Sequence, residues 1–105
     1  MARVDFDYHG IDDAIHGRVR LAAMAFLSGA GEADFVELRS RIGGTDGNLL
    51  IHLRRLEDAG YVEVEKKSAI KGKSRTIYRL TPAGRQAWIR YIKRIEALIE
   101  AGARR

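Results

Sequence analysis

The segment TDGNLLIHLRRLEDAG, residues 45–60, decides the fold of this chain. Three leucines in it recur at helical spacing and form one apolar stripe: Leu49, Leu53 and Leu56. Such a stripe must pack against other parts of the protein. Thr45 suits the N-cap, because its hydroxyl can accept a hydrogen bond from a free amide of the first turn. Gly60 suits the end, since glycine tolerates the left-handed backbone that comes after many helices. We therefore predict a two-faced helix over 45–59.

A second short amphipathic segment precedes this helix. Asp34 is placed to cap it, and Glu37 three residues later completes a pattern like a capping box. The pair Gly43-Gly44 separates this predicted helix, 34–42, from the helix over 45–59. A helix, a tight glycine turn and a second helix form the helix-turn-helix pattern. We therefore expect the second helix to lie in a nucleic-acid groove.

After Gly60 the hydrophobic period changes from helical to alternating. The runs YVEVE (61–65) and RTIYRL (75–80) alternate and are rich in β-branched and aromatic residues, which is typical of strands. Together they predict a hairpin over 61–80 whose tip carries Lys and Arg but no acid. A lysine-rich edge that prevents aggregation would have the same composition. The position beside the helix-turn-helix favours phosphate or minor-groove binding instead.

Thr81-Pro82 predicts the start of the last helix, 82–100, with threonine as N-cap and proline in the first helical position. The apolar residues of this helix recur at nearly heptad spacing, and so small a domain has little core with which to cover them. We therefore expect a second copy of the chain to pack here, with the first helix contributing; purely intramolecular packing is the alternative. The predicted interface comprises Ile11, Ile15, Trp88, Tyr91, Ile92, Ile95, Leu98 and Ile99.

The N-terminal third is less regular. Residues 1–10 have no sustained period and are interpreted as an arm. Residues 11–28 are predicted to form the first helix, with Asp12 and Asp13 in its first turn, where carboxylates suit the helix dipole. Residues 29–33 are predicted to be a loop with room for one short edge strand.

Composition narrows the class of function. A chain of 105 residues forms one domain, and its net charge of +5 favours a polyanionic partner. Acids gather in residues 1–13, whereas Lys and Arg outnumber them over 39–94, so the basic field belongs to the helix-turn-helix, the hairpin and the last helix. The absence of cysteine excludes disulfides and thiolate metal sites.

The sequence gives no support for a membrane protein, an exported protein or an enzyme. The most apolar stretch, 21–31, is too short to cross a bilayer, and it comes after an acidic rather than a basic N-terminus. We therefore expect a cytoplasmic protein with no membrane partner. The chain has no phosphate-binding glycine loop, no paired-histidine metal motif and no nucleophile beside a base. We expect neither an enzyme nor a bound cofactor or metal.

Two stretches taken together, DFVELRSRIGGTDGNLLIHLRRLEDAGYVEVEKK (34–67) and GKSRTIYRLTPAGRQAW (72–88), resemble the small MarR/ArsR-type winged-helix transcriptional regulators. The resemblance covers roughly 12–99. It implies an α+β, mostly helical winged helix-turn-helix with a C-terminal dimerisation helix, and a homodimer that binds double-stranded DNA. The implied groove-side positions are Thr45, Asp46, Gly47, Asn48, Ile51, Arg54 and Arg55, and the implied wing contacts are Lys67, Lys71, Lys73 and Arg75.

This chain departs from that family at Leu50 and Ile51, where many relatives carry polar residues. Apolar side chains there can touch thymine methyl groups but cannot hydrogen-bond to base edges. Two alternatives therefore stay open. One is a protein-interaction module that uses Leu50, Ile51 and the last helix. The other is a MarR-like regulator with a small-molecule pocket at the dimer interface, lined by Phe26, Trp88 and Tyr91. His52, at the edge of the buried stripe, is expected to be packed or hydrogen-bonded.

Overall fold

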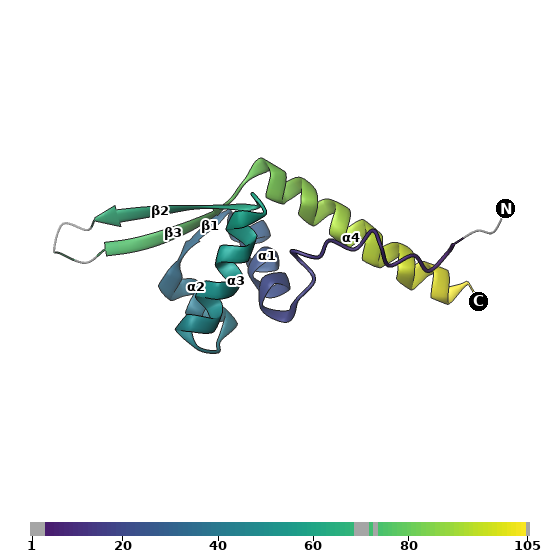
Figure 1. The fold of residues 1–105 in the computed structure, drawn as a ribbon, viewed down its shortest axis with the longest axis horizontal. Coiled ribbons are helices and arrows are strands. Elements are labelled where there is room, and N and C mark those ends of the chain that lie inside the picture. The colour runs from purple at the N-terminus through teal and green to yellow at the C-terminus, as the bar shows by residue number, and fades with distance from the viewer. Residues whose placement is uncertain (1–3, 69–71, 73, 105) are drawn as a thin grey trace.

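The computed structural model describes residues 4–68, 72 and 74–104 (Figure 1). The predicted wing contacts Lys71 and Lys73 lie outside the described residues. The elements are α1 (Arg18–Ala30), β1 (Glu32–Asp34), α2 (Phe35–Ile42), α3 (Asp46–Asp58), β2 (Val62–Ser68), β3 (Ser74–Leu80) and α4 (Pro82–Ala103). The predicted winged helix-turn-helix fold is confirmed.

The core forms around the leucine stripe of α3. Gly43 and Gly44 both have a φ of 84°, a left-handed conformation that lets the chain turn tightly between α2 and α3. The stripe joins side chains of α1 and α2 in one buried cluster that includes Leu49, Leu53, Leu56, Met24, Leu27 and Leu38. The opposite face of α3 is left exposed.

The strands form one antiparallel sheet in the order β1-β3-β2. We expected residues 29–33 to be a loop that could hold one short edge strand, and β1, which begins at Glu32, is that strand. Val62 lies opposite Leu80 and Ser68 opposite Ser74, so β2 and β3 form a regular hairpin. Figure 1 shows this hairpin extending away from the helices, which makes it the wing.

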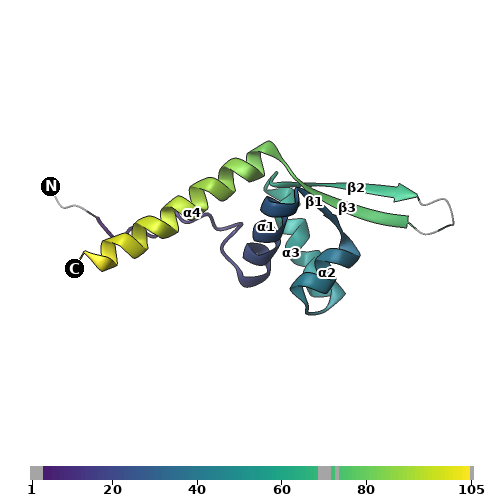
Figure 2. The same ribbon diagram turned by 180° about the vertical axis from the view of Figure 1, so that it is seen from behind.

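α4 is anchored where α3 meets the sheet. The Thr81 hydroxyl donates to the Gly60 carbonyl at 2.6 Å and accepts from the Gly84 amide at 2.9 Å, as an N-cap does. From there α4 projects away from the body, opposite to the wing, and the N-terminal arm lies along it (Figures 1 and 2). The radius of gyration, 16.3 Å, exceeds the roughly 13 Å of a compact chain of this length. Much of α4 is therefore far from the core.

The predicted start of the first helix is wrong. α1 begins at Arg18 rather than at residue 11, after Gly17, whose extended backbone has a φ of −169°. The Asp12 carboxylate accepts hydrogen bonds from the amides of Ala14 (2.9 Å) and Ile15 (3.2 Å). An aspartate that bonds nearby amides in this way offers the backbone an alternative to the helix. Asp12 and Asp13 therefore belong to a turn.

Candidate nucleic-acid interface

α3 begins and ends as its sequence predicts. The Thr45 hydroxyl accepts from the Asn48 amide at 3.2 Å. At the other end Gly60, with a φ of 83°, donates to the Glu57 carbonyl at 2.9 Å, and Tyr61 donates to the Leu56 carbonyl at 3.0 Å. These two bonds make a Schellman motif, which satisfies the last carbonyls of the helix. The caps fix where α3 begins and ends, and its buried leucines fix which face points to solvent.

All seven predicted groove-side positions of α3 are exposed: Thr45, Asp46, Gly47, Asn48, Ile51, Arg54 and Arg55. Two of them already have ionic partners. Asp46 accepts from Nε of Arg39 on α2 at 2.7 Å. Arg55 donates from Nη2 to the carboxylate of Asp13 at 3.1 Å. Among the described residues Arg54 forms no ion pair, so it is the arginine of α3 that is free to bind a partner.

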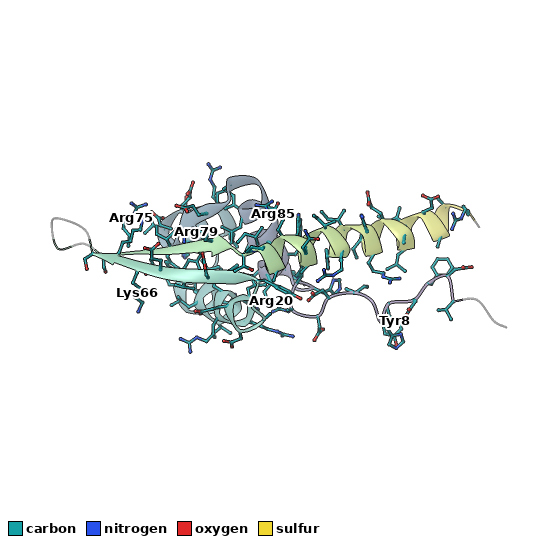
Figure 3. The ribbon with its side chains drawn as sticks, turned by 90° about the horizontal axis from the view of Figure 1, so that it is seen from above. Tyr8, Arg20, Lys66, Arg75, Arg79 and Arg85 are labelled. Carbon is teal, nitrogen blue, oxygen red and sulfur yellow. The ribbon has the colours of Figure 1, made fainter. Side chains whose placement is uncertain are left out.

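The wing carries the second set of predicted contacts. The predicted contact Lys67 is exposed on β2, whereas Arg75 on β3 pairs with the Asp34 carboxylate at 3.2 Å. Lys66, which was not among the predicted wing contacts, is also exposed on β2. Arg79 contacts three glutamates of the sheet, at distances between 2.8 and 3.3 Å: Glu32, Glu63 and Glu65. These hydrogen bonds raise the pKa of Arg79. Figure 3 shows Lys66 and Arg75 farther out along the wing than Arg79.

A groove of about 610 Å³ lies between the wing and helices α2 and α3. Arg54, Lys66 and Arg75 contribute its positive charge, and Asp34 and Glu57 its negative charge. Apolar side chains line the rest, among them Val36 and Leu50. The exposed face of α3 and the basic side of the wing therefore meet at one concave surface.

A buried arginine, which the sequence reasoning missed, supports α3 from behind. Arg20 is 7% exposed and donates to the Ala14 carbonyl at 2.6 Å and to Nδ1 of His52 at 2.8 Å. Because arginine can only donate, Nδ1 of His52 accepts, which fits its expected hydrogen-bonded role. Burial, and then the charges of Arg20 and Arg55, lower the pKa of His52. The signal for Arg20 was its helical spacing from Ala23, Met24 and Leu27.

A further contact ties the turn before α1 to the start of the wing. The Tyr61 hydroxyl donates to the Asp12 carboxylate at 2.5 Å, and this hydrogen bond raises the pKa of Tyr61. With the Arg55–Asp13 pair, it holds residues 11–17 against α3 and the base of β2. This turn therefore helps to orient the candidate interface.

The predicted dimer contacts fall into two groups. Ile15 (0% exposed) and Tyr91 (5% exposed) are buried in the protomer's own core, and Tyr91 shares a 2.9 Å hydrogen bond with His16. The Ile15 side chain therefore has no surface to offer a second copy and Tyr91 has little, which argues against these two predicted contacts. Ile92 and Ile99 are exposed, and the remaining four are half-buried: Ile11, Trp88, Ile95 and Leu98. Ile89, which was not predicted, is also exposed.

Within one protomer, Phe26, Trp88 and Tyr91 do not together line either large groove of the described residues. Trp88 stacks on Tyr91, with ring centroids 5.9 Å apart, and Phe26 lies under the Arg41 guanidinium. A second groove of about 610 Å³ runs between the N-terminal arm and α4, where Tyr91, Arg90 and Arg94 line it. Phe26 and Trp88 line neither groove. The pocket expected from these three residues at a dimer interface stays a prediction.

Membrane spans and metal sites are both absent from the described part of the chain. None of its helices has the length and apolar character that crossing a membrane requires. Within the same residues, no group of three or more His, Asp or Glu side chains is arranged to hold a metal ion.

A helix-turn-helix followed by a basic wing defines the winged-helix class of DNA-binding regulators. Residues 19–99 match the model of the winged helix DNA-binding domain family. An uncharacterized protein of Methanocaldococcus jannaschii is 44% identical over 77 residues, which cover 73% of this chain and 83% of that protein. The chain belongs to the winged helix DNA-binding domain family.

Solved structures agree with this assignment. The transcriptional regulator homologue of Pyrococcus horikoshii OT3 has a TM-score of 0.76 and 31% identity, covering 83% of this chain and 85% of its own. A MarR-family regulator of Enterococcus faecalis V583 has a TM-score of 0.71 and 27% identity, covering 88% and 84%. The resemblance to MarR/ArsR-type regulators is confirmed, and the protein is a winged-helix DNA-binding regulator of that type.

Proposed function

We propose that this protein is a homodimeric transcriptional regulator that recognises a specific DNA sequence. α3 enters the major groove, and the wing lies along the backbone or in the adjacent minor groove. The observation that carries the proposal is the concave surface that Arg54 of α3, which forms no ion pair among the described residues, lines together with Lys66 of the wing. A major groove about 12 Å wide admits one α-helix.

The two kinds of side chain on this surface have different tasks. Lys66 and Lys67 neutralise phosphates and fix the register of the protein on the duplex. Asn48 and Arg54 supply hydrogen bonds to base edges, since asparagine pairs well with adenine and arginine with guanine. The Asp46–Arg39 pair ties the first turn of α3 to α2. Sequence discrimination therefore rests on few hydrogen-bonding side chains.

The dimer is proposed to form through α4. This helix has 22 residues and projects from the body, as Figure 2 illustrates. Ile92 and Ile99 expose 38% and 68% of their surface, and with Trp88 and Ile95 they recur at heptad spacing. A second α4 packed on this stripe would remove it from water. A symmetric dimer would then present its two α3 helices to half-sites about one helical turn apart.

The proposal is tested by binding of the purified protein to the DNA upstream of its own gene, with unrelated DNA as competitor. Tight binding that survives competitor and falls steeply with salt is the expected result, because each phosphate contact releases counterions. The double variant Lys66→Glu, Lys67→Glu should weaken binding to every duplex. The double variant Arg85→Glu, Arg90→Glu, which makes the same change of four charge units at exposed positions of α4, is the matched control.

Weak and equal binding to all duplexes would contradict the proposal. The second candidate function, a protein-interaction module, would then gain support. It rests on one observation: Leu50 and Ile51 expose 48% and 69% of their surface on α3.

A further inference from the structure

Three large apolar side chains are exposed on α2 and α3, and two of them line the wing groove. Val36 is 75% exposed, Leu50 48% and Ile51 69%. Val36 and Leu50 line the groove together, and Ile51 comes directly after Leu50 on the exposed face of α3. Large apolar side chains that gather on a surface mark a contact site. Phosphate binding does not account for these three side chains, because they carry no charge and form no hydrogen bonds.

The charges around this apolar patch favour a polyanion as its partner. Arg54 lies one turn of α3 beyond Leu50, and Lys66 lines the same groove; neither forms an ion pair among the described residues. Of the two acids there, Asp34 is occupied, because it accepts from the Glu37 amide at 2.8 Å and pairs with Arg75. Glu57 is the remaining acid. The partner should combine negative charge with small apolar groups.

The major groove of DNA offers this combination. Among the base edges, thymine is distinguished there by its C5-methyl group, which apolar side chains contact. Leucine and isoleucine can neither donate nor accept a hydrogen bond, so they gain only by removing such methyl groups from water. We propose that Leu50 and Ile51 read thymine methyl groups, so that the preferred duplex carries thymines opposite the middle of α3. This inference rests on the proposed function, DNA binding through α3.

The test begins with a duplex selected from a random-sequence library by the full chain. Each thymine of that duplex is then replaced by deoxyuridine, which keeps the base pair and removes only the methyl group. We expect affinity to fall about fourfold for each contacted methyl group, the change that corresponds to burial of one such group. Thymines elsewhere in the duplex should tolerate the replacement.

Two variants assign the effect to its side chains. Leu50→Ala and Ile51→Ala, which keep a strong helix former at exposed positions, should bind the thymine and deoxyuridine duplexes more nearly equally. Leu21→Ala is the matched control, because Leu21 on α1 is 36% exposed and does not line the groove. It should keep the full difference between the two duplexes.

The outcomes separate this inference from the function on which it rests. If no selected duplex binds better than unrelated DNA, the proposed function fails and the inference fails with it. If a selected duplex binds tightly but tolerates every deoxyuridine, DNA recognition stands and the methyl reading is overturned. A thymine preference that survives in the Leu50→Ala, Ile51→Ala double variant would also overturn it, because other side chains would then read the methyl groups.

Discussion

Two neighbouring arginines of α3 have different surroundings. Arg55 donates to the Asp13 carboxylate at 3.1 Å, in a pair whose side chains are 50% and 95% exposed. Such an exposed pair contributes about 0–1 kcal/mol, so it holds the side chain only weakly but competes for its guanidinium. Arg54 has no ionic partner among the described residues and lines the wing groove. Because the two arginines are adjacent, the sequence alone does not show that only Arg55 is ion-paired among the described residues.

We predict that Arg54→Ala weakens binding to the preferred duplex by about 1–3 kcal/mol, with little change on unrelated DNA, because it removes a base contact. Arg55→Ala should have a smaller effect. Fluorescence anisotropy on both duplexes measures the two losses. Equal losses on both duplexes would instead make Arg54 a phosphate contact.

His52 predicts a pH dependence of stability. Its pKa is lowered in the folded protein below the ordinary 6.5, first by burial and then by Arg20 and Arg55. The unfolded chain therefore binds the proton more tightly, and stability falls as the pH drops below about 6.5 towards the folded pKa. Urea denaturation at pH 7.5 and 5.5 measures this loss. His52→Asn, whose amide oxygen can accept from Arg20 without titrating, should lose less stability over this interval; an unchanged loss would contradict the assignment.

At the scale of elements, the sequence predicted the end of a helix correctly where residues close to it in the chain determine that end. Thr45, Gly60 and Thr81 act as predicted, because caps and turns depend on bonds within a few residues. The start of α1 was predicted wrongly, since the turn before it depends on Asp12, which also binds the distant Tyr61. Ionic partners such as Asp13 for Arg55 could not be predicted, because 42 positions separate them.

The junction of α4 with the body yields a prediction at this scale. At Gly84 the backbone of α4 approaches the residue before β2 so closely that an added Cβ would overlap the Tyr61 carbonyl. Gly84→Ala should therefore destabilise the protein by about 1–3 kcal/mol, the usual effect of overpacking. Gly102→Ala, in the same helix but with open space around it, should be neutral or slightly stabilising. Equal urea midpoints for the two variants would refute the close approach.

The whole molecule is elongated, with principal extents of 64 × 26 × 21 Å. The wing projects at one end and α4 at the other, as Figure 1 shows. Tyr91 of α4 is part of the core, whereas Ile92 and Ile99 farther along the helix stay exposed. This shape suits a dimer in which α4 joins two bodies and leaves both wings outermost. The sequence predicted that α4 forms the dimer contact. Only the three-dimensional structure shows that Ile15 and Tyr91, which were predicted as part of that contact, are buried within the protomer.

We predict that Ile99→Asp dissociates the dimer, because it places an unpaired charge in a buried contact at a cost of roughly 3–5 kcal/mol. Ile99 is 68% exposed in the protomer, so the substitution should leave the fold intact. Ile51→Asp is the matched control, since that isoleucine is 69% exposed but lies on α3. Sedimentation velocity should show a monomer for the first variant and a dimer for the second; a dimer for both would place the interface elsewhere.

The most direct test of the central claim is a hydroxyl-radical footprint of the protein on its preferred duplex. A dimer with α3 in the major groove predicts two symmetric protected regions, centred about 10–10.5 base pairs or a multiple of that spacing apart. The wings should add protection beyond each half-site. A single protected region, or uniform protection along the duplex, would contradict recognition by a symmetric pair of α3 helices.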